Sequence, residues 1–260
     1  MKRDLTILLL IIGGLFAGIY FWLSYEPKTD EESDKPDSSL FGEEITERIT
    51  TSLEQQLTFI ENEHTDAFEK ALRERFEPQI EEKGDFSKIR IVQGDQVNAF
   101  TTVGDGIYLF EGLLKKLDDP EMVAAVVAHE WGHIHHTHVE DRLRRDIGTS
   151  LLMSIITGGN QGMIVELSRT MMELSYSRSQ ELEADDFARD ALKEAQIHPQ
   201  KLSQSFLRMR SLSDADSPPA FLTTHPALED RIERILEFEV DDDFEERELE
   251  FDWDEFIDSL

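Results

Sequence analysis

The chain has 260 residues and a formal net charge of -30 at pH 7, because 56 Asp and Glu residues outnumber 26 Lys and Arg residues. This charge argues against nucleic acid as a partner, since the phosphates would be repelled. The sequence contains no cysteine, which excludes disulfides, thiolate metal ligands and a cysteine nucleophile. A transition metal would therefore have to be held by histidine and carboxylate side chains.

The N-terminal segment contains an uncharged apolar run from Leu5 to Leu23. A run of this length can cross a bilayer as a helix. Lys2 and Arg3 precede it and an acidic stretch follows, which predicts a cytoplasmic N-terminus. We therefore predict that residues 1–25 form one uncleaved transmembrane anchor and that the rest of the chain lies on the extracytoplasmic side. A cleaved signal peptide is the alternative, but the run is longer than a usual signal core and no small-residue cleavage site follows it.

The segment after the anchor, residues 26–41, is polar, charged and proline-containing, so we expect a flexible linker. A folded domain is predicted over residues 42–238. Its first element is a helix over residues 42–76, because apolar residues recur there at steps of three, four or eight. Pro78 and Gly84 are expected to end this helix.

Short alternating runs of Ile, Val, Phe and Tyr follow in residues 88–94 and 96–110, with glycine-containing turns between them. This pattern predicts the strands of a small sheet. A helix should then begin at Pro120, because proline suits the first turn and the acidic residues before it favour a helix N-terminus. Residues 143–178 are expected to be mostly helical, with a break at 157–160. Further helices are predicted over residues 179–195, 199–212 and 226–238.

The C-terminal segment, residues 239–260, is dominated by acidic residues. A solvated, disordered tail is the favoured interpretation, because such a composition does not usually form a packed core. Its apolar residues, among them Leu249, Phe251, Trp253 and Phe256, leave a docking role open.

Five of the eight histidines lie in the sequence AAVVAHEWGHIHHTH, residues 124–138. His129 and His133 are four residues apart and share one face of the predicted helix. Together with Glu130 they form HExxH, in which two imidazoles bind zinc and the glutamate acts as a base. The apolar run before the motif would bury the helix, and Gly132 leaves space near a metal.

Zinc needs a third protein ligand if a water molecule is to keep the fourth position. A histidine ten residues after the first, the metzincin solution, is excluded because Val139 stands there. His136 could share the face of the motif, but it is not at a standard ligand position. The sequence SRSQELEADDFA, residues 177–188, places Glu181 and Asp185 on one face of a later helix. Glu181 can bind the metal, and Asp185 can accept a hydrogen bond from the free nitrogen of a ligand histidine.

The other histidines and acids near these motifs are expected to have structural roles. His135 should face away from the metal and be solvated, and His138 should pack or make a structural hydrogen bond. Glu183 lies between the two acids of the second motif and should point away from them.

Three motifs in order resemble those of a known family. They are HEWGH at 129–133, SRSQELEAD at 177–185 and THPALEDRI at 224–232. Together they resemble the motifs of HtpX-like and BepA-like zinc metallopeptidases, peptidase family M48, a membrane-associated gluzincin group related to the CAAX proteases. The resemblance covers roughly residues 42–238, and the ordered set is much more specific than any single motif. The bulky Trp131 is a modest departure from the family pattern.

The resemblance implies an α+β fold, a predominantly helical zincin-type domain with a small β-sheet beside the active-site helix. It also implies one zinc ion per chain, held by His129, His133 and Glu181. Glu130 would be the base, and proteins or peptides would be the substrates. Residues 98–114 resemble the family segment that supplies an edge strand to the substrate.

We therefore predict a membrane-tethered zinc endopeptidase, and the family resemblance alone suggests a role in envelope protein quality control. Two alternatives stay open. One is a membrane-tethered chaperone or assembly factor with a zinc site and little proteolysis. The other is a zinc hydrolase that does not act on peptides. The intact Glu130 argues against a pure binding module.

His225 stands in the third motif, just before the helix that Pro226 would begin. In the resembling family this position lies near the zinc, and two catalytic roles are open. As a hydrogen-bond donor His225 would stabilise the oxyanion of the transition state. As a neutral imidazole it would take the fourth zinc position and hold the enzyme inactive. A histidine without a catalytic role is the third possibility.

Overall fold

The structure is a computed structural model, and it describes residues 43–86, 88–147, 161–173, 175–212, 218–241 and 243–260. The predicted membrane anchor and linker, residues 1–41, lie outside the described residues. Within the part of the chain that the structure describes, no helix combines the length and the apolar character needed to span a membrane.

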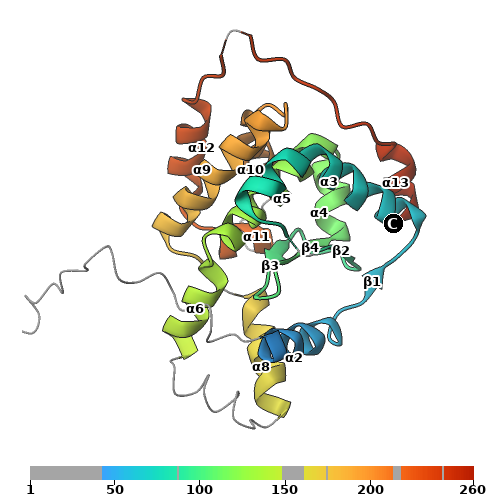
Figure 1. Ribbon diagram of the computed structural model, residues 1–260, viewed down its shortest axis with the longest axis vertical. Coiled ribbons are helices and arrows are strands. Elements are labelled where there is room, and N and C mark those ends of the chain that lie inside the picture. Colours follow the sequence, from blue (N-terminus) through green and yellow to red (C-terminus); the bar gives the residue numbers. More distant parts are fainter. Residues whose placement is uncertain (1–42, 87, 148–160, 174, 213–217, 242) are drawn as a thin grey trace, which may run out of the picture. The chain divides into compact units, whose positions relative to one another are not determined.

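Most of the described chain is helical, and four short strands form a small sheet (Figure 1). This confirms the predicted predominantly helical α+β domain. The helices are α2 (Glu43–Glu54), α3 (Glu63–Lys83), α4 (Glu111–Leu117), α5 (Pro120–His135), α6 (His138–Ile147), α8 (Gln161–Met172), α9 (Arg178–Glu194), α10 (Gln200–Ser211), α11 (Ala220–Thr224), α12 (Leu228–Leu236) and α13 (Trp253–Ser259). The strands are β1 (Phe59–Ile60), β2 (Lys88–Val92), β3 (Ala99–Thr101) and β4 (Gly106–Phe110).

The sheet has the strand order β1-β2-β4-β3. β2 and β4 are parallel, whereas β1 and β3 are antiparallel to their neighbours. The strands predicted in residues 88–94 and 96–110 are confirmed. β3 lies at one end of this order, where it pairs with β4 and packs against α5. The sheet therefore ends beside the helix that carries the HExxH motif.

The single helix predicted over residues 42–76 is wrong, because β1 separates α2 from α3. Ile60 in β1 pairs with Ile91 in β2, so this part of the apolar pattern belongs to a strand. Asn62 then begins α3 with a capping box, since its side chain accepts hydrogen bonds from two backbone N–H groups in the first turn. Apolar residues recur across this break because α2, β1 and α3 each contribute side chains to buried clusters.

The predicted end of this helical region at Pro78 is also wrong, whereas the end at Gly84 is confirmed. Pro78 lies inside α3, and Gly84 follows the last turn with φ 90°, a value that favours glycine. The carbonyl of Gly84 accepts a hydrogen bond of 3.0 Å from the indole of Trp131. Trp131 is fully buried and packs edge-on against Phe76 and Phe187. The bulky tryptophan after the glutamate of HExxH thus joins α5 to α3 and α9.

The contact between α5 and α9 is unusually close at Gly132. A Cβ atom added to this glycine would lie 2.9 Å from both the Cα and the carbonyl oxygen of Ala184. Real Cβ atoms are essentially never so close to backbone atoms, so any larger residue would push the helices apart. The glycine predicted to give space near a metal instead gives space to the helix that carries the second motif.

The acidic C-terminal segment is packed against the domain, so the favoured interpretation of a disordered tail is wrong. Phe256 in α13 is fully buried and stacks on Phe68 of α3, with ring centroids 4.7 Å apart. Leu249 is buried, and its backbone N–H donates a 2.9 Å hydrogen bond to Glu121 at the start of α5. Arg75 of α3 donates to two backbone carbonyls of the same segment. Burial of these aromatic side chains stabilises the packed segment, which its acidic composition did not predict.

Candidate metal centre

Two buried helices place the first two motifs opposite each other. α5 is buried from Val123 to His133, so the side chains of HExxH face the interior. α9 begins with a second capping box, in which Ser177 accepts from the backbone N–H of Gln180 and the side chain of Gln180 accepts from the backbone N–H of Ser177. This cap fixes the first turn of α9, so that Glu181 points into the space beside α5.

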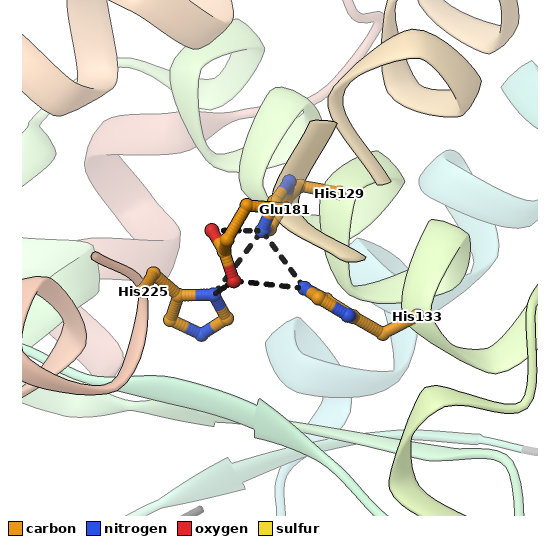
Figure 2. Close-up of side chains that lie close together, drawn as sticks. All are labelled: His129, His133, Glu181 and His225. Carbon is orange, nitrogen blue, oxygen red and sulfur yellow. Dashed lines mark hydrogen bonds and ion pairs between the residues drawn. The ribbon is translucent and has the colours of Figure 1, made fainter. Parts of the chain in front are cut away.

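Four side chains converge at this point, as Figure 2 shows. They are His129 and His133 from α5, Glu181 from α9, and His225 from the connection between α11 and α12. One ligand atom of each residue lies within 4.8 Å of the others. All four side chains are almost completely buried, with at most 1% of their surface exposed. The structure thus brings the predicted ligands together and adds His225 to them.

The spacing of the donor atoms fits a metal ion the size of zinc. Nε2 of His129 lies 3.1 Å from Nε2 of His133. The carboxylate oxygens of Glu181 lie 3.6 Å from Nε2 of His133 and 3.7 Å from Nε2 of His129. Two ligands of a tetrahedral zinc ion, each about 2.0–2.1 Å from the metal, are about 3.4 Å apart. The distance of 3.1 Å between the two histidines is shorter than this value, and the distances of 3.6 and 3.7 Å to Glu181 are longer.

The second nitrogen of each motif histidine faces a polar partner outside the cluster. Nδ1 of His129 lies 3.0 Å from Oδ1 of Asp185, as predicted for this carboxylate. Nδ1 of His133 lies 2.9 Å from Nδ1 of His138. If both Nδ1 atoms carry the proton, the two Nε2 atoms present lone pairs to each other. Two lone pairs at 3.1 Å repel unless a cation lies between them, so the donor set fits a bound metal.

The charge states of these groups suit metal binding. Burial lowers the pKa of His129 and lowers that of His133 well below its ordinary value, so both rings are neutral near pH 7. Burial alone would raise the pKa of Glu181, but His225 and the guanidinium of Arg231 outweigh it and lower this pKa. Two neutral imidazoles and one carboxylate are the ligand types of many zinc hydrolases.

Glu130 lies beside the cluster with a carboxylate that has no hydrogen-bond partner among the described residues. Its side chain is fully buried, and burial raises its pKa to about 7. The nearest charged or imidazole group is Nε2 of His225, 3.4 Å from Oε1. A carboxylate with a pKa near neutrality can both take and release a proton at physiological pH, which a general base requires.

The structure brings a ring nitrogen of His225 into the same cluster as the three predicted ligands. Its Nδ1 lies 3.2 Å from Nε2 of His129 and 3.1 Å from Oε1 of Glu181. The ring stacks on Phe221 with a centroid distance of 4.1 Å, and the backbone N–H of His225 donates to the carbonyl of the same residue. α11, which the sequence did not predict, therefore holds the imidazole against the other three groups.

Arg231 is a residue of the site that the sequence analysis missed. Its guanidinium is fully buried and donates to both oxygens of Asp185, at 2.6 and 2.7 Å. The same group contacts Oε2 of Glu181. Its charge holds the pKa of Asp185 well below the usual range, although burial alone would raise it. The third motif contained the signal, because this arginine follows His225 by six residues in THPALEDRI.

The remaining residues singled out in the sequence lie around the cluster. His136 is exposed and does not belong to it. His135 is exposed, and its Nδ1 lies 2.8 Å from the carbonyl oxygen of Lys83. His138 is buried and makes the expected structural hydrogen bond, since its Nδ1 lies 2.9 Å from Nδ1 of His133. Tyr176, which the sequence analysis did not single out, stacks on the ring of His133 with ring centroids 3.7 Å apart.

The fold and this donor set define the class, which is a metallopeptidase. The chain belongs to peptidase family M48, whose sequence pattern matches residues 62–239. The family recognised from the three motifs is therefore confirmed.

Proteins of bacteria and plants are similar to part of this chain. Metalloprotease LoiP of Escherichia coli K12 is 29% identical over 153 residues, which are 56% of this chain and 60% of that protein. A putative beta-barrel assembly-enhancing protease of Vibrio cholerae is 31% identical over 158 residues, 55% of this chain and 32% of that protein. The mitochondrial metalloendopeptidase OMA1 of Arabidopsis thaliana is 27% identical over 157 residues, 59% of this chain and 32% of that protein. The matched region thus spans less than two thirds of each relative.

Replacing Arg231 with methionine should lower the free energy of unfolding of the zinc-free protein by about 3–5 kcal/mol, because two buried carboxylates lose their counter-ion. Urea denaturation after chelation measures this change. Arg234→Met is the matched control on the same helix, since Arg234 is half-exposed and pairs with Asp186 at the surface. Arg234→Met should lower the free energy of unfolding by no more than about 1 kcal/mol. Equal effects of the two substitutions would contradict the assigned role of Arg231.

Proposed function

We propose that this protein is a zinc-dependent endopeptidase that binds one zinc ion per chain. The observation that carries this proposal is the cluster of His129, His133, Glu181 and His225 beside the fully buried carboxylate of Glu130. Membership of peptidase family M48 and the relatives named as metalloproteases support it.

The cluster would supply the zinc ligands, and Glu130 beside it would supply the base. His129 and His133 would hold zinc through Nε2, and Glu181 would hold it through its carboxylate. Zinc held by these residues would supply Lewis-acid chemistry, which polarises a scissile carbonyl and lowers the pKa of a water molecule toward neutrality. Glu130 takes the proton of the attacking water and delivers it to the leaving amine, which its pKa of about 7 allows. Asp185 orients the ring of His129 through its contact with Nδ1.

The substrate is a protein or peptide that pairs with the outer edge of β3. Strand addition of this kind recognises the backbone of the substrate, with side chains read by nearby pockets. A cavity of about 360 Å³ is lined by Asn98, which directly precedes β3, and by residues that include Phe110, Met172 and Thr224. Because Thr224 lines this cavity and immediately precedes His225, a substrate side chain held there would lie near the connection that carries His225.

The catalytic domain acts on envelope proteins in quality control. This proposal rests on relatives named beta-barrel assembly-enhancing protease and on the predicted anchor of residues 1–25. The alternative is a membrane-tethered chaperone or assembly factor with little proteolysis, and the nearly complete burial of the cluster favours it. Cleavage assays decide between the two.

Replacing Glu130 with glutamine should lower the rate of casein cleavage by about 10²–10⁴-fold, the usual contribution of a general base, while zinc stays bound. Glu181→Ala should instead lose zinc together with activity. Cleavage is followed by fluorescence of labelled casein, and zinc by elemental analysis of the same samples. A wild-type protein that binds zinc stoichiometrically but cleaves nothing would favour the chaperone alternative. Full zinc retention in Glu181→Ala would remove Glu181 from the ligands.

Replacing His225 with alanine should raise basal cleavage, because an Nδ1 atom this close to His129 and Glu181 would exclude the attacking water from a bound metal. Turnover is measured at saturating zinc and compared with the wild type. A fall of about 10²–10³-fold with zinc retained would instead assign His225 as the oxyanion donor. An unchanged rate would exclude both catalytic roles.

The catalytic domain should lie on the extracytoplasmic side, because Lys2 and Arg3 precede the apolar run. Fusing alkaline phosphatase, which is active only outside the cytoplasm, after Leu260 should give an active reporter. A fusion that is active only with a cytoplasmic reporter would contradict this topology. Recovery of a soluble protein that begins near residue 26 would show cleavage of the N-terminal segment instead.

A further inference from the structure

A chain of three polar groups leads from the cluster to the protein surface on the side of His133. Nδ1 of His133 lies 2.9 Å from Nδ1 of His138, and Nε2 of His138 lies 3.0 Å from Oε2 of Glu183. His138 stands at the start of α6 and Glu183 lies on α9, between Glu181 and Asp185 in the sequence. We name these three groups the His133 relay.

The relay permits one arrangement of protons. The carboxylate of Glu183 can only accept, so Nε2 of His138 must donate to it. A neutral His138 then has an unprotonated Nδ1, which accepts from Nδ1–H of His133. His133 is therefore left with a free lone pair on Nε2, the atom that faces His129 and Glu181. The tautomer that metal binding requires is thus set by a carboxylate two groups away.

The packing around the relay fixes the ring positions as well as the tautomer. Tyr176 stacks on His133 with a centroid distance of 3.7 Å and an angle of 20°. His138 is 97% buried, since only 3% of its surface is exposed, whereas the side chain of Glu183 is 54% exposed. The outer group can therefore be changed at the surface without creating a cavity in the core.

The two motif histidines are supported in different ways. His129 faces Asp185, a buried carboxylate that Arg231 anchors with two hydrogen bonds. His133 has no carboxylate within direct reach of Nδ1 among the described contacts, and His138 bridges the distance to Glu183. Each of the two histidines is thus connected to a carboxylate of α9. His129 contacts Asp185 directly, and His133 reaches Glu183 through His138.

We propose that His138 and Glu183 are positioning residues of the metal site, which hold His133 in the Nδ1–H tautomer with Nε2 directed at the metal. This inference rests on the proposed zinc site, and it concerns metal affinity before any effect on turnover. Groups that orient a metal-binding histidine from outside the ligand set typically change metal affinity by 10–100-fold when they are removed.

The test measures the zinc dissociation constant of the full-length protein by competition with a chromophoric chelator. His138→Ala should raise this constant about 10–100-fold. His138→Asn should recover most of the loss, because the amide oxygen can accept from His133 in place of Nδ1. His135→Ala is the control from the same segment, and its dissociation constant should equal that of the wild type.

The surface end of the relay gives a second pair of variants that carries little risk of misfolding. Glu183→Ala should raise the zinc dissociation constant, and by less than His138→Ala does, because the imidazole itself remains. Glu183→Gln should stay near the wild type, since its amide oxygen still accepts from His138. Long-range ¹H–¹⁵N correlation spectra should show the Nδ1–H tautomer of His133 in the wild type and a mixture of tautomers in His138→Ala.

The possible failures can be told apart. If the wild type binds zinc and His138→Ala binds it equally well, the relay has no positioning role while the proposed metal site stands. The same conclusion follows if His138→Asn is as weak as His138→Ala, because then only packing has been lost. If the wild type binds no zinc, the proposed function itself fails and the relay inference falls with it.

Discussion

The close contact of α5 and α9 at Gly132 is the constraint on which the metal centre depends. A side chain at this position would overlap the backbone of Ala184, so only glycine lets the two helices approach this closely. At that separation His133 and Glu181 come within 3.6 Å of each other across the interface. The fully buried Trp131 holds α5 against its neighbours. The positions of the candidate ligands are therefore a consequence of helix packing.

Such packing buries charge, and the rest of the site compensates for it. Glu181 and Asp185 are both almost inaccessible to water, and isolated carboxylates are costly to bury. Arg231 pairs with both carboxylates, and because it lies on α12 it also ties the connection that carries His225 to α9. The guanidinium of Arg231 thus connects the carboxylates of α9 with the third motif.

The sequence predicted those parts of the protein that depend on local spacing. HExxH lies on a buried helix, Glu181 and Asp185 share one face of the next motif helix, and the small sheet lies beside them. The parts that depend on tertiary contacts were not predictable in the same way. The docked C-terminal segment has an acidic composition, and its few aromatic residues find partners on α3 only in the folded chain. The role of Arg231 likewise depends on helices that are far apart in sequence.

The central claim is that one zinc ion lies between His129, His133 and Glu181. Diffraction data collected on both sides of the zinc absorption edge test it most directly. We expect a single anomalous peak per chain, with imidazole nitrogens of α5 and a carboxylate oxygen of α9 about 2.0–2.2 Å away. A peak outside this cluster, or a zinc ion that Glu181 does not touch, would contradict it.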